Sequence, residues 1–246
     1  MEQINKMNKS LPDAEYSIIA DSYAELIPTK AHNAYYERPA MLSILPDVKN
    51  KIILDAGCGT GMYTKILIEK GATVTGIDAN EKMLKNAEKI IQNKAKFIHA
   101  NLEEPLPFIE NEYFDGIVSA LTITYFNNLN NVFNEYYRII KNNGWFLFST
   151  EHPFFQYLCH KLDNYYDERK LEFEWKGFNE NVIMKSYYHN LQTLTDALTN
   201  NNFLIEKILE PKPIEQFKDT IEGKDKYNRY LRFPLFICIL ARKIIY

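Results

Sequence analysis

The stretch LDAGCGTGMYT, residues 54–64, places Gly57, Gly59 and Gly61 within five positions of a 246-residue chain that has only 9 glycines. Glycine loses more backbone entropy on folding than other residues, roughly 0.5–1 kcal/mol relative to alanine in regular structure. A cluster of glycines is therefore expected where the chain turns sharply or where a ligand lies against the main chain. KIILDAG before the cluster is typical of a buried strand, and MYTKILIEK after it is typical of a helix.

Short apolar runs alternate with amphipathic helical patterns from residue 51 to about residue 151. Further strands are predicted at 72–78, 96–100, 114–121 and 143–151, the last opened by Gly144. Helices are predicted at 80–93, with Asn80 as N-cap, and at 129–141. Alternating strands and helices with nearly continuous apolar strands indicate an α/β fold whose parallel sheet is covered on both faces. Right-handed crossovers then favour a doubly wound, Rossmann-like arrangement.

The flanking segments extend this core. Residues 191–201 are predicted to form a helix, and residues 203–209 and 235–243 two last strands near the sheet edge. We therefore expect a mostly parallel seven-stranded sheet with the last strand antiparallel. The whole chain, 1–246, is interpreted as one domain. It divides into a helical N-terminal segment (1–50), a cofactor-binding core (51–151), an aromatic-rich insertion (152–190) and a C-terminal helix with strands (191–246).

The insertion at 152–190 holds ten aromatic residues in 39 positions. Connections between core elements usually run about 2–6 residues, and long loops are often functional. Because it follows the fifth strand, the insertion is placed to cover the carboxyl edge of the sheet, where ligands bind in open α/β folds. We interpret it as a lid or substrate pocket. The alternative is an added subdomain that only stabilises the fold.

Composition excludes several classes of protein. A net charge of −3 gives no global basic footprint for nucleic acid or an anionic membrane. The three cysteines, Cys58, Cys159 and Cys238, form no CxxC pair, so no metal site is expected and a reducing compartment is favoured. No stretch has the length and apolarity of a signal peptide or a membrane span, so we expect a cytoplasmic protein without membrane partners.

The glycine cluster lies between a strand and a helix, as in nucleotide-binding turns, where a ligand contacts bare backbone amides. Asp78 follows Gly61 by 17 residues and closes the second predicted strand, in TGID. A carboxylate there can accept hydrogen bonds from ribose hydroxyls. The dehydrogenase pattern GxGxxG would require a third glycine where this chain has Met62, and Asp55 lies two residues before the first glycine.

DxGxGxG followed by a strand-ending acid resembles the class I S-adenosylmethionine-dependent methyltransferases, in particular the small-molecule group whose first motif reads LDxGCGxG. The likeness is strong over about residues 50–150. EHPFF, with the later HNLQTL and EPKP, resembles a group of uncharacterised bacterial members of this family. The resemblance implies S-adenosyl-L-methionine as cofactor and S-adenosyl-L-homocysteine as product.

The resemblance also implies roles for single residues. Gly57, Cys58, Gly59 and Gly61 match the loop around the methionine part of the cofactor. Asp55 matches the acidic position near the methionine amino group, and Asp78 matches the ribose acid. The remaining matches are Ala79, Met83, Asn101 and Leu102 beside the adenine, Ser119 and Ala120 at the end of the fourth strand under the cofactor, and Tyr23 as an aromatic that closes over it. The family usually has Asp where this chain has Asn101.

Candidates for the acceptor site follow from position. His152 comes directly after the fifth strand, His189 ends the insertion and Tyr125 follows the fourth strand. Each could orient an acceptor, and a histidine could take its proton if the acceptor ionises near the transition state. For each, a purely structural role is the alternative, as it is for Ser119 and Tyr23.

The acceptor is expected to be a small molecule, aromatic or partly apolar. The place after the fourth strand reads SALT, and neither the PP motif of nucleic-acid amino-methyltransferases nor the Pro-Cys pair of cytosine-C5 enzymes occurs. No motif indicates the acceptor atom or the oligomeric state. Two alternatives to a small-molecule methyltransferase are a catalytically silent S-adenosylmethionine-binding regulatory protein and an NAD-dependent oxidoreductase.

Overall fold

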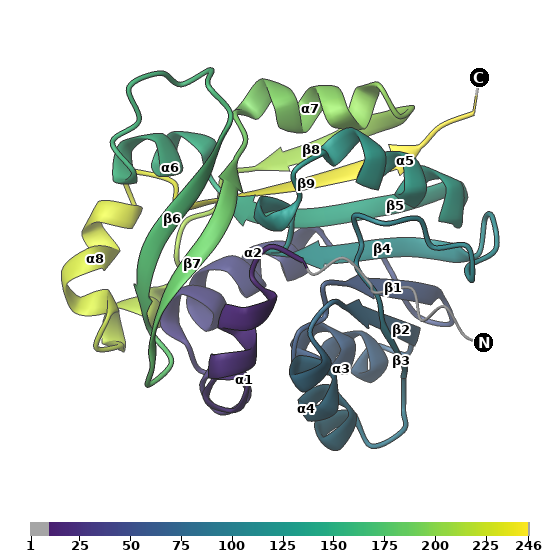
Figure 1. Cartoon of the computed structure of the whole chain (residues 1–246), viewed down its shortest axis with the longest axis horizontal. Coiled ribbons are helices and arrows are strands. Elements are labelled where there is room, and N and C mark those ends of the chain that lie inside the picture. Colours follow the sequence, from purple (N-terminus) through teal and green to yellow (C-terminus); the bar gives the residue numbers. More distant parts are fainter. Residues whose placement is uncertain (1–9, 246) are drawn as a thin grey trace, which may run out of the picture.

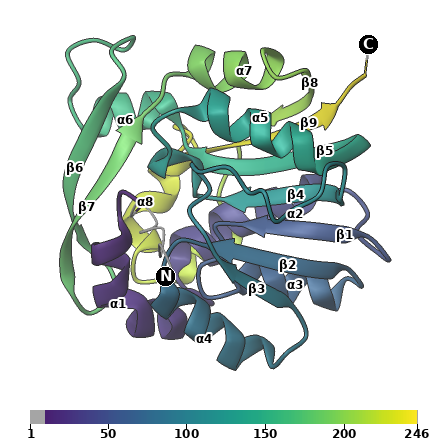
Figure 2. The same cartoon turned by 45° about the vertical axis from the view of Figure 1, so that its right-hand side comes forward.

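The structure is a computed structural model that describes residues 10–245. Its centre is a seven-stranded sheet in the order β3-β2-β1-β4-β5-β9-β8 (Figures 1 and 2). The strands are β1 Ile52–Ala56, β2 Thr73–Asp78, β3 Lys96–His99, β4 Phe114–Ala120, β5 Ile140–Glu151, β8 Phe203–Leu209 and β9 Phe236–Lys243. Strand β9 runs antiparallel to both of its neighbours, β5 and β8, so the expected α/β sheet with an antiparallel last strand is confirmed.

Helices cover both faces of the sheet because successive strand residues point to opposite sides. On β5, Trp145 and Leu147 pack with α2 (Arg38–Ile44) and α3 (Met62–Glu69). Phe146 and Phe148 pack on the other face, with α5 (Leu129–Ile139) and α7 (Leu191–Thr199). The predicted three-layer organisation of the core is therefore present.

Two local predictions had different outcomes. Helix α4 (Glu81–Ile91) is capped as expected, because the Asn80 side chain accepts a hydrogen bond from Met83 N at 3.0 Å. Strand β5 begins at Ile140, earlier than the predicted start at 143, and α5 ends at Ile139. Ile140 already pairs with Phe114 of β4, and the register shifts before Trp145 pairs with Gly116. This pairing across the sheet, which no local pattern reports, converts the last predicted helical residues into strand.

The N-terminal segment is helical, as expected, for the part described. It contains α1 (Asp13–Leu26), a π-helical turn η1 (Asn33–Glu37) and α2; residues 1–9 lie outside the described residues. Helix α1 packs beside α4 at the edge of the sheet (Figure 1).

The insertion contains α6 (Pro153–Cys159) and a hairpin of β6 (Arg169–Lys176) and β7 (Asn181–Tyr188), which pair as a separate two-stranded sheet. The hairpin alternates strictly: Leu171, Phe173 and Trp175 face inward and the intervening charged residues face outward. It stands beside α1, away from the central sheet (Figures 1 and 2). The sequence analysis did not predict this hairpin, although its period of two was visible in KLEFEWK.

The rest of the chain closes the same side of the molecule. It comprises η2 (Ile123–Tyr125), η3 (Glu215–Asp219) and α8 (Gly223–Tyr230).

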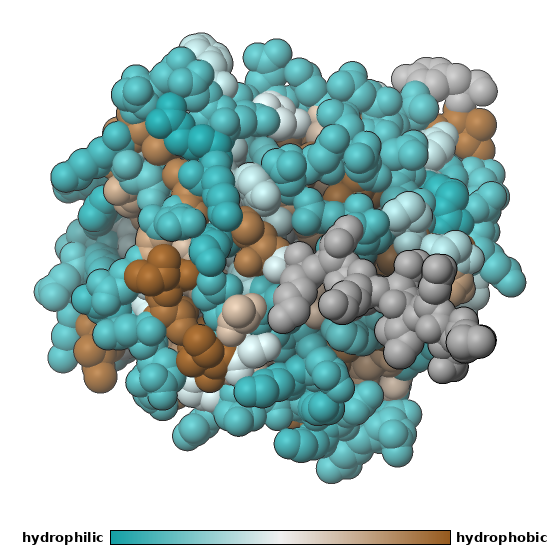
Figure 3. Space-filling model, in the orientation of Figure 1, coloured by the Kyte–Doolittle hydropathy of each residue, from teal (hydrophilic) through white to brown (hydrophobic). Residues whose placement is uncertain are grey.

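The face in Figure 3 is mostly hydrophilic, with hydrophobic side chains gathered over the region where the hairpin approaches α1. Ile183 on β7 and Ile18 on α1 are both more than half exposed. The division of the chain into one domain with four segments stays a prediction.

Candidate functional site

The glycine turn connects β1 to α3 and is tied to the neighbouring strand. The N–H groups of Gly57 and Cys58 both donate to the carbonyl oxygen of Ile77, at 2.8 and 3.1 Å. Gly57, Gly59 and Gly61 have φ values of +77°, +52° and +83°, a region that favours glycine. The sharp turn expected from the sequence is therefore present and is fixed against the end of β2.

The three glycines serve different purposes. A Cβ on Gly57 would lie 2.2 Å from Thr122 Oγ1, and one on Gly61 would lie 3.3 Å from Ala87 Cβ, where α3 packs against α4. A Cβ on Gly59 would meet no heavy atom closer than 4.0 Å, that of Tyr23 Cε1. Gly57 and Gly61 are thus required by close packing within the protein, whereas Gly59 leaves bare backbone facing open space.

Asp78 lies at the end of β2, beside this turn. Its Oδ2 accepts a hydrogen bond from Gly59 N at 2.8 Å, and its Oδ1 accepts one from Asn80 N at 2.8 Å. Burial raises the pKa of the carboxyl, and the two N–H donors oppose that shift by stabilising the ionised form. Asp78 therefore joins the glycine turn to the start of α4.

Asp55 has a different place from the one that the sequence suggested. It is only 1% exposed, its Oδ2 accepts a hydrogen bond from Thr64 Oγ1 at 2.6 Å, and burial raises its pKa to about 7. The carboxyl is thus used to hold the first turn of α3 onto β1. It does not line the cavity described below, so the expected contact with the methionine amino group has no support from its position.

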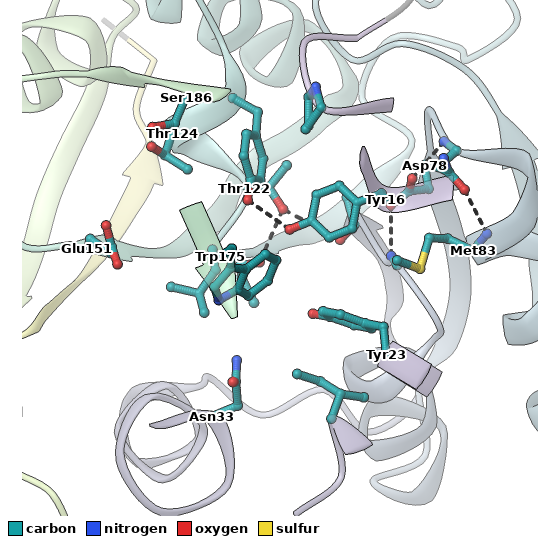
Figure 4. A pocket seen from close by; sticks show the side chains of 18 of the residues that line it. Tyr16, Tyr23, Asn33, Asp78, Met83, Thr122, Thr124, Glu151, Trp175 and Ser186 are labelled. Carbon is teal, nitrogen blue, oxygen red and sulfur yellow. Dashed lines mark hydrogen bonds between the residues drawn. The ribbon is translucent and has the colours of Figure 1, made fainter. Parts of the chain in front are cut away.

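A cavity of about 360 Å³ runs from the glycine turn to the hairpin. Its first end is formed by Gly57, Gly59, Asp78, Ala79 and Met83, which come from β1, β2, α4 and their connections. Figure 4 shows Asp78 and Met83 on one side of the cavity, with the Tyr23 ring below them. The other sequence candidates in this wall are Asn101, Leu102, Ala120 and Tyr23.

Aromatic side chains from distant segments meet in the middle of the cavity. Tyr16 of α1 and Tyr125 of η2 share a hydrogen bond of 2.8 Å between their hydroxyl groups. The Tyr16 ring makes edge contacts with Tyr23, Tyr125 and Trp175, with ring centroids 5.9, 5.7 and 6.2 Å apart. Phe178, in the turn of the hairpin, lies against Tyr23 at 4.7 Å. Helix α1 and the hairpin therefore wall the cavity together.

Comparisons with known proteins agree with this arrangement. A protein of Haemophilus influenzae whose function is uncharacterised is 31% identical over 234 residues, which cover 86% of this chain and 89% of that protein. A solved structure of a Listeria monocytogenes protein, assigned as an S-adenosylmethionine-dependent methyltransferase, is 28% identical and has a TM-score of 0.72, covering 85% of this chain and 97% of that one. The family model described as "Methyltransferase domain" matches residues 54–148, which include the glycine turn and Asp78.

The chain belongs to the class I S-adenosylmethionine-dependent methyltransferases. S-adenosylmethionine is its methyl donor. The family assignment sets aside the NAD-dependent oxidoreductase that the glycine turn also allowed. A malonyl-[acyl-carrier protein] O-methyltransferase of Hamiltonella defensa is 30% identical over 147 residues, which cover 60% of this chain and 54% of that protein.

Some residues that the family resemblance named do not reach the cavity of this methyltransferase. Ser119 is fully buried and its hydroxyl donates to Ala56 O at 3.0 Å, between β4 and β1. Cys58 and Gly61 are also absent from the cavity wall. These residues shape the turn and the strand ends instead of facing a ligand.

The two histidine candidates lie outside the cavity wall as well. The Nε2 of His152 is 2.8 Å from Glu210, and its Nδ1 accepts a hydrogen bond from Phe154 N at the start of α6. The Nε2 of His189 is 2.8 Å from Phe126 O. Both rings are buried, and their contacts are with other parts of the chain. Their placement therefore corrects the expectation that they face the acceptor. Tyr125 does line the cavity.

Two residues that the sequence analysis passed over line the far end of the cavity. Glu151 ends β5, and its pKa is raised by burial, against a smaller lowering by the hydrogen bond from Gln156. Ser186 is on the inner face of β7. Glu151 was detectable, because it follows the fifth strand directly at the edge where ligands bind. Ser186 required the hairpin to be recognised first.

The part of the chain described here, residues 10–245, has no helix that is long and apolar enough to cross a bilayer. Within the same residues no group of three or more His, Cys, Asp or Glu side chains is arranged to hold a metal ion.

Proposed function

We propose that this methyltransferase transfers the methyl group of S-adenosylmethionine to a small molecule that is held in the same cavity, by in-line displacement. The main support for this proposal is that one cavity of about 360 Å³ extends from the glycine turn to the aromatic hairpin. Binding pockets for small molecules commonly have volumes of about 300–1,000 Å³.

The residues at the first end fit the cofactor. The open backbone at Gly59 would allow close approach of the methionine part, and Asp78 would accept hydrogen bonds from the ribose hydroxyls. Met83 and Leu102 supply apolar surface for the adenine, and the amide oxygen of Asn101 could accept from its amino group. Bound there, the cofactor supplies an electrophilic methyl group on a positively charged sulfur.

The protein's own contribution is to orient the acceptor and to exclude water. Tyr16, Tyr23 and Tyr125 lie between the two ends, where their electron-rich rings would favour a cation by roughly 0.5–2 kcal/mol. Burial raises the pKa of the Tyr125 hydroxyl, so this group stays protonated at neutral pH and acts as a hydrogen-bond partner. Holding two reactants in line can lower a barrier by several kcal/mol, up to about 7–11 in the best cases.

The cover formed by α1 and the hairpin favours a small acceptor over a macromolecule. Apolar and aromatic side chains, among them Phe173, Trp175 and Phe178, enclose the far end. The Hamiltonella defensa relative acts on a malonyl group carried by a protein, but its match covers only 54% of that protein. We therefore propose an aromatic or partly apolar acceptor for this chain.

Calorimetric titration with S-adenosyl-L-homocysteine tests the cofactor half of this proposal. We expect saturable binding with one site per chain, and we expect Asp78→Asn to weaken it. Methyl release from labelled S-adenosylmethionine, measured on a panel of aromatic amines, phenols and carboxylic acids, tests the acceptor half. Binding without methyl release to any acceptor class would instead favour the silent regulatory protein.

A further inference from the structure

Ser186 carries a hydroxyl group that has no partner within the protein. The residue is 2% exposed and lines the cavity, and its Oγ makes no hydrogen bond to any of residues 10–245. A buried hydroxyl without a partner costs free energy, and native proteins rarely keep one. A ligand in the cavity would supply the missing hydrogen bond.

Glu151 lies at the same end of the cavity. Its Oε2 accepts a hydrogen bond from Gln156 Nε2 at 3.2 Å, while Oε1 has no hydrogen bond to the described part of the chain. Gln156 also reaches Thr124 Oγ1 at 3.5 Å, so one buried amide holds both side chains in place. Figure 4 shows Glu151, Thr124 and Ser186 on the side of the cavity opposite to Asp78.

The charges around Glu151 determine which ligands fit. The two basic side chains in the described wall of the cavity, Lys30 and His32, both contact the carboxylate of Glu222, with Lys30 Nζ at 2.8 Å and His32 Nδ1 at 3.2 Å. No ion pair within residues 10–245 involves Glu151. A carboxylate on the ligand would therefore face a second carboxylate, and the wall formed by residues 10–245 holds no unpaired cation to offset it, which is unfavourable where water is partly excluded.

We propose that Glu151 and Ser186 form the subsite for the head group of the acceptor. The subsite selects an amine or a hydroxyl group on an apolar body, and it rejects a carboxylate. The head group donates a hydrogen bond to Glu151 Oε1 and satisfies Ser186 Oγ. The body of the acceptor lies against Phe173 and Trp175 of the hairpin. This inference rests on the proposed function, since it takes the acceptor to be bound in this cavity.

Matched probes test the selection directly. Tryptamine, tryptophol and indole-3-acetate share one body and differ in the head group, as do 2-phenylethylamine, 2-phenylethanol and phenylacetate. Each is titrated by calorimetry into protein saturated with S-adenosyl-L-homocysteine. We expect the amine or the alcohol of at least one series to bind at least tenfold more tightly than its carboxylate. Equal binding of all three head groups, tighter binding of the carboxylate, or no binding of either series overturns the inference.

Variants separate the subsite from a general effect of charge. Glu151→Gln should abolish the preference over the carboxylate. The matched control Glu172→Gln changes an exposed residue on the outer face of β6 and should leave the preference unchanged. If Glu151→Gln still prefers the amine or alcohol over the carboxylate, another group recognises the head group.

Ser186→Ala distinguishes a ligand-binding serine from an ordinary core residue. Because its hydroxyl has no partner, we expect an unchanged or higher melting temperature without ligand, together with at least threefold weaker binding of the preferred probe. A lower melting temperature with unchanged probe binding contradicts the assignment. Binding of S-adenosyl-L-homocysteine should survive in both variants, so its loss in Asp78→Asn tests the proposed function separately.

Discussion

Replacement of Gly59 by alanine tests whether the glycine turn lies against the cofactor. The new Cβ would have no heavy atom closer than Tyr23 Cε1 at 4.0 Å, so the protein itself accommodates it. The residue has φ +52°, and a left-handed conformation costs a residue with a Cβ roughly 1–2 kcal/mol. Folding stability should therefore fall by about that amount.

The effect on cofactor binding follows from the same geometry. A ligand in van der Waals contact with bare backbone lies about 3.5–4.0 Å from it. A methyl group that projects about 1.5 Å into that gap forces the ligand to move by 1 Å or more. A displacement of this size removes about a quarter to a half of the energy of each dispersion contact, and it lengthens neighbouring hydrogen bonds. We expect the dissociation constant for S-adenosyl-L-homocysteine to rise about 10–100-fold.

Gly71→Ala is the matched control. Gly71 has φ +89°, its Cβ would meet Lys49 Cγ at an ordinary 3.4 Å, and it is absent from the cavity wall. Both variants should lose similar stability in chemical denaturation, and only Gly59→Ala should lose affinity in calorimetry. If the Gly59 variant binds S-adenosyl-L-homocysteine as tightly as the Gly71 variant does, the cofactor does not lie on this backbone and the reasoning is refuted.

Three further predictions concern single side chains. In Asp78→Asn the new side chain has one acceptor oxygen and no charge, so it cannot accept hydrogen bonds from both Gly59 N and Asn80 N. We expect cofactor binding to weaken by about 1.5–3 kcal/mol, which is roughly 10–150-fold in the dissociation constant measured by the same titration. Burial raises the pKa of Asp55 to about 7 in the folded protein, well above that of an aspartate in an unfolded chain. The wild type should therefore lose stability as pH rises from about 4 to 7. Asp55→Asn should remove most of that slope, on the order of 4 kcal/mol, and parallel melting curves of the two proteins against pH would contradict the raised pKa. Phe178 is 1% exposed, so Phe178→Ala should cost about 3–5 kcal/mol of folding stability in urea titration, and a loss below 1 kcal/mol would mean that the hairpin is not packed as described.

The sequence predicted the frame of this protein because the frame follows from local periodicity. Apolar runs between amphipathic helices specify parallel strands buried on both faces, and the positions of β1, β2 and α4 follow from it directly. The predicted start of β5 at residue 143 was wrong: the strand begins at Ile140, because pairing with Phe114 outweighs the helical preference of that segment. The β6–β7 hairpin was missed because the insertion was interpreted as one loop, and its alternation of inward and outward residues was not considered.

The site divides in the same way. A glycine turn and an acid at a strand end lie together because the chain order of one βαβ unit places them so, and the sequence was enough to bring Gly59 and Asp78 to one wall. A side chain's direction depends on what surrounds it, so the orientations of Asp55 and His152 could only come from the tertiary structure. Sequence alone determined the family and the end of the sheet at which the glycine turn and Asp78 lie together. Only the tertiary packing decided which polar groups line the cavity, because no local pattern encodes which of them find partners on other segments.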